Sequence, residues 1–171
     1  MWNKILWAVL VFGAIAVTGS VALSDEDEAS GAAIAKYLPS AKVTLQQGLT
    51  AAESQGQPIS GKFEIDEGHF QLSVYTAEGG KFSEVLVDYS TGKVARSEAI
   101  TGGDDLKEAK EQVAAMGKAK KSLKALVDQA ERERAGYRAI GVEAEVKNGH
   151  AVAVVRLLKG TEVKSVSEPL E

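Results

Sequence analysis

The sequence predicts an α+β protein with two similar units, each a helix packed on a small antiparallel sheet, after an N-terminal signal peptide. Three observations predict it: an apolar N-terminal run, period-2 alternation broken by glycine turns, and an order of helix and strands that occurs twice. The chain has 171 residues and no cysteine. It can therefore bury a core without disulfides, and it has no thiol for catalysis or metal binding.

The first 24 residues are predicted to be the signal peptide. Lys4 is the only charged side chain before Asp25, and it precedes an apolar run over residues 5–17. Cleavage before Leu23 or before Asp25 fits, because small residues stand at the third and first positions before each cut. The alternative is an uncleaved anchor over residues 5–23, close to the ~20 residues that span a bilayer. In both cases the rest of the chain is expected outside the cytoplasm, either periplasmic or secreted.

Residues 25–42 are predicted to be an acidic, flexible linker with one short helical turn over 32–38. Pro39 ends that turn. A helix then follows from Thr44, a residue type that caps helices, to about Gln55.

Alternating runs after this helix predict an antiparallel meander that completes a first unit over residues 43–100. The predicted strands cover residues 62–66, 69–75 and 82–88, with a short last strand from Val94. Gly68 supplies the hairpin turn between the first two strands.

A connecting helix is predicted over residues 104–117, because Asp105 and Glu108 resemble a capping box and apolar residues follow with helical spacing. The second unit covers residues 118–171 and begins with a helix that Ser122 caps. Its strands are predicted at residues 142–147, 150–157 and 162–166, with Gly149 in the hairpin turn.

The two units share residue types at matching positions. Glu64, Gly68 and His69 correspond to Glu145, Gly149 and His150 at an offset of 81 (150 − 69 = 81). Thr44 and Ser122, which open the two helices, are 78 residues apart (122 − 44 = 78), and gaps in loops account for the difference. We interpret this pattern as an internal duplication.

The first unit resembles the PepSY domain over about residues 43–96. The hallmark of that family is a strand that ends in Asp, two further residues, and then Thr-Gly-Lys-Val; Asp88, Thr91, Gly92, Lys93 and Val94 match it. The second unit departs from the pattern, because residues 165–169 contain neither the Asp nor the Thr-Gly. The resemblance implies an exported or membrane-tethered, non-catalytic protein that binds a protein partner, with an extracellular protease as the implied class.

Few residues suggest chemistry. His69 and His150 are the weak candidates for a metal site, but neither has a second histidine four residues away, and we interpret both as exposed residues at strand starts. No Gly-x-Ser-x-Gly and no phosphate loop occur, so no catalytic residue and no cofactor are predicted. Asp88 is expected to bond the backbone of its own turn and to act in folding.

Composition disfavours a nucleic-acid partner, since the net charge is −4 and only 6% of residues are aromatic. The cluster Lys118, Lys120, Lys121 and Lys124 is followed by mixed charges, which is typical of a solvated helix face.

The leading hypothesis is an exported, non-catalytic module that binds or regulates an envelope protein. It would contact the membrane only through an uncleaved N-terminal segment. One alternative is an envelope protein that binds a metal or small ligand through His69 and His150; the other is an enzyme of unknown type.

Overall fold

The computed structural model describes the backbone of residues 19–21 and 25–171 and the side chains of residues 29–171. The predicted signal peptide or anchor therefore lies outside the described residues, apart from residues 19–21. Within the described part, no helix has the length and apolar character needed to cross a membrane.

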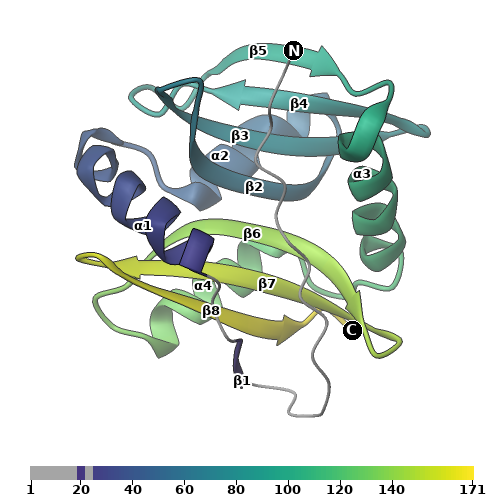
Figure 1. Ribbon diagram of the computed structural model, residues 1–171. Coiled ribbons are helices and arrows are strands. Elements are labelled where there is room, and N and C mark those ends of the chain that lie inside the picture. The colour runs from purple at the N-terminus through teal and green to yellow at the C-terminus, as the bar shows by residue number, and fades with distance from the viewer. Residues whose placement is uncertain (1–18, 22–24) are drawn as a thin grey trace.

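One antiparallel sheet of eight strands contains every strand of the described chain (Figure 1). Its strand order is β1-β8-β7-β6-β2-β3-β4-β5. The strands are β1 (Gly19–Val21), β2 (Gln57–Asp66), β3 (His69–Glu78), β4 (Lys81–Val87), β5 (Val94–Ala99), β6 (Arg138–Lys147), β7 (His150–Lys159) and β8 (Glu162–Pro169). The α+β class and the antiparallel strands agree with the sequence prediction.

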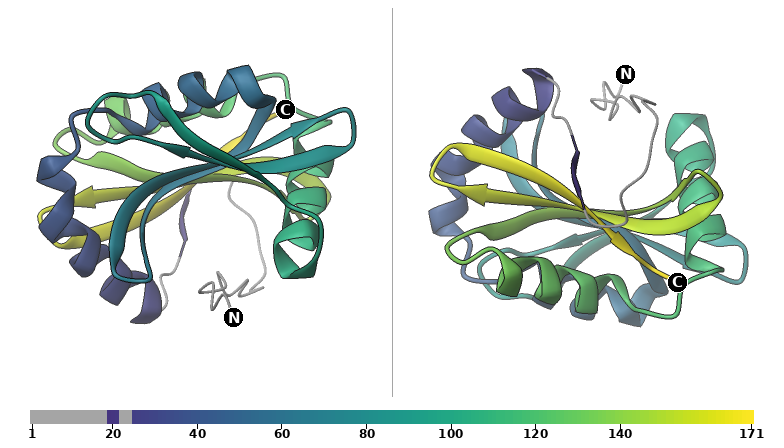
Figure 2. Two further views of the ribbon diagram at one scale, coloured as in Figure 1. Left: turned by 90° about the horizontal axis from the view of Figure 1, so that it is seen from above. Right: turned by 90° about the horizontal axis from the view of Figure 1, so that it is seen from below.

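Helices cover both faces of this sheet. They are α1 (Asp25–Tyr37), α2 (Leu45–Ala52), α3 (Gly103–Met116) and α4 (Leu123–Glu133), with short 3-10 turns at Leu38–Ser40 and Glu53–Gln55. Helices α2 and α4 lie along one face, whereas α1 and α3 stand at opposite sides of the other face (Figure 2).

Both helices on the first face begin at a polar cap. Thr44 and Gln47 form a capping box, in which each side chain accepts a hydrogen bond from the other residue's backbone N–H. The Ser122 hydroxyl accepts a hydrogen bond from the backbone N–H of Ala125 at 3.2 Å. Each helix then turns an apolar stripe to the sheet, formed by Leu45, Leu49 and Ala52 in α2 and by Leu123, Leu126, Val127 and Ala130 in α4.

Gly48 lies close to the sheet that α2 covers. A Cβ atom at this position would lie 2.5 Å from the side chain of Leu72 on β3. The glycine costs helix propensity, about 1 kcal/mol relative to alanine. It also allows a close contact that a larger residue would prevent, so packing explains its place in the helix.

The two long hairpins have the same two-residue turn. Glu67 and Gly68 adopt φ values of 47° and 81°, and Asn148 and Gly149 adopt 51° and 83°. Two successive positive φ values are typical of the type I′ turn, whose twist matches that of the flanking strands.

Residues 25–37 form helix α1 and not the predicted flexible linker. The reason is tertiary packing, because Ile34 is only 3% exposed and belongs to the main core. Gly31 lies so close to Val163 of β8 that a Cβ atom there would overlap its side chain. The sequence did not predict this helix, because the segment has a low hydrophobic content and packs through a few small residues.

The strands of the two predicted units join in one sheet where β2 pairs with β6. Ser60 faces Glu143, Gly61 faces Val142 and Lys62 faces Gly141. The sequence predicted two small sheets without this pairing. An unpaired edge on each would expose backbone N–H and C=O groups, and the β2–β6 pairing joins the two edges over these three residue pairs.

Arg138, at the start of β6, ties the second half of the chain to the segment before α2. Its guanidinium donates hydrogen bonds to the carbonyl oxygens of Leu38 (3.1 Å), Ala41 (3.2 Å) and Val43 (2.9 Å). It also lies 5.5 Å from the centre of the Phe63 ring on β2. One side chain therefore satisfies three acceptors of an irregular segment.

Gln46 links α2 directly to α4. Its amide nitrogen donates to Asp128 at 3.1 Å and to Glu131 at 2.7 Å. Glu131 in turn accepts a hydrogen bond from the backbone N–H of Ala139 at 2.7 Å. This chain of bonds runs from one helix through the other to β6.

Replacing Arg138 with alanine should lower the free energy of unfolding by about 2–4 kcal/mol, because three carbonyl groups lose a charged donor. Arg132→Ala, on the exposed side of α4, is the matched control and should change stability by less than about 0.5 kcal/mol. Urea unfolding of both variants measures the difference. Equal stability of the two variants would contradict the assigned role of Arg138.

Candidate functional site

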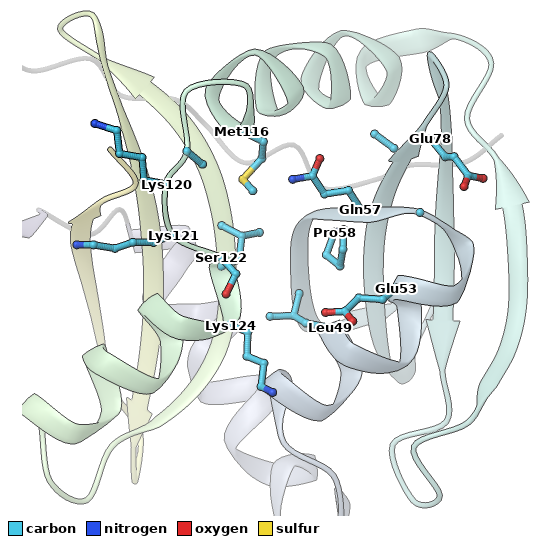
Figure 3. A pocket seen from close by; sticks show the side chains of 14 residues that line it. Leu49, Glu53, Gln57, Pro58, Glu78, Met116, Lys120, Lys121, Ser122 and Lys124 are labelled. Atoms are coloured by element: carbon cyan, nitrogen blue, oxygen red, sulfur yellow. The ribbon is translucent and has the colours of Figure 1, made fainter.

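A pocket of about 610 Å³ lies between the C-terminal part of α2 and the loop that joins α3 to α4 (Figure 3). We call it the α2–α4 pocket. Leu49, Pro58, Met116 and Leu123 give it an apolar lining. Its volume is within the range of pockets that hold small molecules or short peptide segments.

Backbone hydrogen bonds fix the α3–α4 loop that forms one wall of the pocket. The N–H groups of Lys120 and Lys121 both donate to the carbonyl oxygen of Leu170, at 2.7 and 3.2 Å. The Lys118 ammonium donates to the carbonyl oxygen of Gly149 at 2.9 Å. The loop is thus held by the end of the chain and by the β6–β7 hairpin.

Opposite charges line the two walls of the pocket. Lys120, Lys121 and Lys124 belong to the loop and the start of α4, and Glu53 and Glu78 belong to the facing wall (Figure 3). All five side chains are exposed, and within the described chain none of the three lysines forms a salt bridge. The Glu53 carboxylate points into the pocket, whereas the side chains of Lys120 and Lys121 stand at its rim and point away from it (Figure 3).

We call Lys120, Lys121 and Lys124 the lysine wall. From the sequence these lysines could not be distinguished from an ordinary solvated helix face. Three of the four clustered lysines line the pocket, whereas Lys118 is bonded to the neighbouring hairpin. The missing information is the position of Glu53 and Glu78, which lie far from the lysines in sequence. Only the docking of the α3–α4 loop beside α2 brings them together.

His69 and His150 lie at opposite ends of the sheet. Strands β2 and β6 are antiparallel, with Ser60 opposite Glu143. If the same register continued along β6, Lys147, which pairs with His150, would lie opposite residue 56. That position is ten residues from Asp66, the partner of His69 (66 − 56 = 10), or roughly 30 Å along the strand. Both histidines are exposed. They do not meet within one chain to bind a metal.

No other metal site is evident in the described part of the chain. Among the side chains of residues 29–171, no group of three or more His, Cys, Asp or Glu could hold a metal ion. His150 lies 3.5 Å from Glu171, a lone contact between two surface side chains.

Asp88 organises the turn between β4 and β5. Its Oδ1 accepts hydrogen bonds from the backbone N–H groups of Ser90 (2.8 Å) and Thr91 (2.7 Å), which lower the pKa of the Asp88 carboxyl. Gly92 adopts a positive φ of 74°, and the Lys93 carbonyl accepts from the Asp88 N–H at 2.9 Å. The expected bond of Asp88 to its own turn is present, and it is a structural one.

A polar network occupies the sheet face opposite α2 and α4. Glu64 accepts hydrogen bonds from Ser73 (2.6 Å) and Gln71 (3.1 Å) and pairs with Lys62 at 2.8 Å. Burial alone would raise the pKa of Glu64, but Lys62 and the two hydrogen bonds outweigh it and lower that pKa. The carboxylate is therefore held in its charged form.

Glu143 of β6 lies on the same face, but its pKa shifts in the opposite direction. Burial, followed by the hydrogen-bonded carboxyl of Glu145, raises the pKa of Glu143 well above its ordinary value. Arg156 opposes this shift but does not overcome it. The sequence does not reveal this network, although Glu64 and Glu145 stand at matching positions, because polar residues in alternating strands are normally solvated.

Comparisons with known proteins add no family. No family model matches the chain, and no curated protein matches it. Among solved structures, the chain is similar to a protein of Clostridium difficile 630 described as a "putative lipoprotein", with a TM-score of 0.39 and 14% sequence identity. The alignment covers 70% of this chain and 78% of that one. A likeness of this size carries no argument about fold or function.

Replacing Glu143 with glutamine should raise the melting temperature at pH 7 by a few degrees. Because the pKa of Glu143 is raised in the folded state, this carboxyl contributes its full stabilisation below the unfolded-state pKa of about 4.3. That stabilisation is lost as the pH rises through the folded-state pKa. Glutamine mimics the protonated form, so the advantage should vanish near pH 4. Glu111→Gln, at an exposed site on α3, is the control. A gain that is equal at both pH values would contradict the prediction.

Proposed function

We propose that this protein is an exported, non-catalytic binding module of the PepSY type that holds a segment of a partner protein in the α2–α4 pocket. The observation that carries the proposal is the pocket itself, with its partly apolar lining, the Glu53 carboxylate that points into it and the lysines at its rim (Figure 3). Export rests on the predicted leader, and the partner class rests on the family resemblance.

The pocket suits a peptide segment for a physical reason. An apolar side chain of the segment would displace water from Pro58, Ala77 and Ala119, the half-buried apolar residues of the lining. An ammonium or guanidinium of the segment would lie toward Glu53, and a carboxylate just outside the pocket would lie toward the lysines at its rim. Such complementarity fixes the direction in which a segment binds and excludes segments of reversed charge.

Two copies of one unit explain features of both halves of the fold. The strand irregularities at 58–60 and 139–141 are 81 residues apart (139 − 58 = 81), which is also the offset of the two type I′ turns. Each copy would comprise one capped helix, α2 or α4, and the three strands that follow it. We infer that duplication placed two similar helices side by side, and that the space between them became the pocket.

The expected role is regulation of an extracytoplasmic partner, with a protease as the class that the PepSY resemblance implies. The alternative of a shared metal site at His69 and His150 would require two chains, because the histidines are far apart in one. The PepSY reading gains support from the Asp88 turn, which has the bond pattern expected of a structural motif.

Reversing the lysine wall should abolish partner capture. The triple variant Lys120→Glu, Lys121→Glu, Lys124→Glu would repel the anionic end of a bound segment, and we expect at least tenfold less partner in a pull-down from the native envelope. The control reverses three exposed lysines outside the pocket, Lys81, Lys93 and Lys110, and so has the same net charge. Mass spectrometry quantifies the captured protein.

Equal capture by the two triple variants would contradict the pocket as the binding site. The double variant His69→Ala, His150→Ala separates the alternative, since it should capture the partner at the wild-type level. Loss of capture in that variant alone would favour the histidine-based reading.

A further inference from the structure

The outer edge of β8 is covered by a very short strand. Among the described residues only β1 pairs with it, and this pairing spans Ser165, Val166 and Ser167 of the eight residues in β8. Val163 and Val166 of β8 are nevertheless buried, because Val163 packs against α1 on one face and Val166 is 1% exposed on the face of α4. What β1 covers is therefore backbone.

The residues of β1 belong to the predicted leader. Both predicted cleavage positions, before Leu23 and before Asp25, follow Gly19–Val21. Cleavage at either position would remove the strand that occupies this edge. The N–H and C=O groups that β1 satisfies would then need another partner.

The sequence of β8 is self-complementary about Val166. If a second copy of the strand ran antiparallel to the first with Val166 facing Val166, Ser165 would face Ser167, and Lys164 would face Glu168. Each of these pairs occurs twice, once on either side of the two-fold axis. Opposite charges directly across an antiparallel pair stabilise it. Val166, the central position of this register, already pairs with a neighbouring strand, because Ser20 of β1 faces it.

An unsatisfied carboxylate oxygen of Glu168 supports this register. Glu168 is 0% exposed, and its Oε1 atom has no hydrogen-bond partner in the described chain. Gln129 donates to Oε2 at 3.2 Å, while the nearest cation to Oε1 is Arg134 at 3.7 Å. An ammonium group from a facing Lys164 would supply the missing donor.

Lys164 is placed to reach across the edge. It stands two residues from Val166 on the same face of β8 as Glu168, because residues at even spacing share a face. In the single chain its ammonium lies 3.3 Å from Glu162 and 4.7 Å from the centre of the Tyr137 ring. Its side chain is 43% exposed, so it can turn toward a neighbouring strand.

We propose that removal of the residues before Leu23 or Asp25 opens the β8 edge, and that two copies of the chain then pair through it. The result is a symmetric dimer with one continuous sheet across a two-fold axis at Val166. In the unprocessed chain β1 occupies the same edge and opposes dimerisation. Processing of the leader would therefore also control the oligomeric state.

The test compares chain 25–171 with chain 19–171, which retains β1. The shorter chain contains every residue of the described core, from Ile34 to Leu170. Sedimentation equilibrium should find a dimer for chain 25–171 at micromolar concentration and weaker association for chain 19–171. Since both chains are made without export, the result is independent of the proposed function.

A single cysteine reports the geometry, because the chain has none of its own. Val166→Cys in chain 25–171 should form a disulfide-linked dimer on mild oxidation, since facing Cα atoms of an antiparallel pair lie about 4.5–5.5 Å apart. Ser97→Cys on β5, the opposite edge strand, is the control and should not cross-link. Lys164→Glu should weaken the dimer about tenfold, whereas Lys81→Glu should not.

A folded chain 25–171 that stays monomeric and does not cross-link through Val166→Cys would overturn the proposal. A dimer that Lys164→Glu leaves unchanged would overturn it equally, since another surface would then hold the copies together. If chain 25–171 fails to fold, Ser20→Pro in chain 19–171 opens the same edge by removing a donor from β1. The same two outcomes apply to that variant.

Discussion

The pairing of β2 with β6 is the constraint on which the rest of this structure depends. It spans three residue pairs, Ser60 to Lys62 against Gly141 to Glu143, and it merges the strands of both halves into one sheet. In this merged sheet α2 and α4 lie side by side on the same face (Figure 2). The α2–α4 pocket exists only as a consequence of that placement, since its walls come from both halves.

A short junction needs support from side chains, and Arg138 and Gln46 provide it. Arg138 satisfies the carbonyl groups of the segment that leads into α2, and Gln46 connects α2 to α4. Arg138 is partly buried and Gln46 is buried at the junction between the two halves, where each lost hydrogen bond leaves an unsatisfied group. Hydrogen bonds as well as apolar packing therefore hold the two halves together. These directional bonds fix the relative position of the pocket walls.

Local signals in the sequence predicted most elements, and distant contacts account for what was missed. Gly68 and Gly149 mark hairpins because a two-residue turn requires positive φ, and Thr44 and Ser122 mark helix starts because caps are local. The β2–β6 register and helix α1 depend on partners far away in the chain, such as Val163 against Gly31. The candidate site was missed for the same reason: its lysines lie within five residues of one another, but Glu53 and Glu78 come from other elements.

Hydrogen exchange at the β2–β6 junction tests the central claim most directly. We expect the amides of residues 60–62 and 141–143 that bond across the junction to exchange as slowly as the core amides of β3 and β7, because one cooperative unit opens only by global unfolding. Much faster exchange at the junction than in β3 and β7 would contradict it. The two halves would then separate while each remained folded, and the pocket between them would not persist.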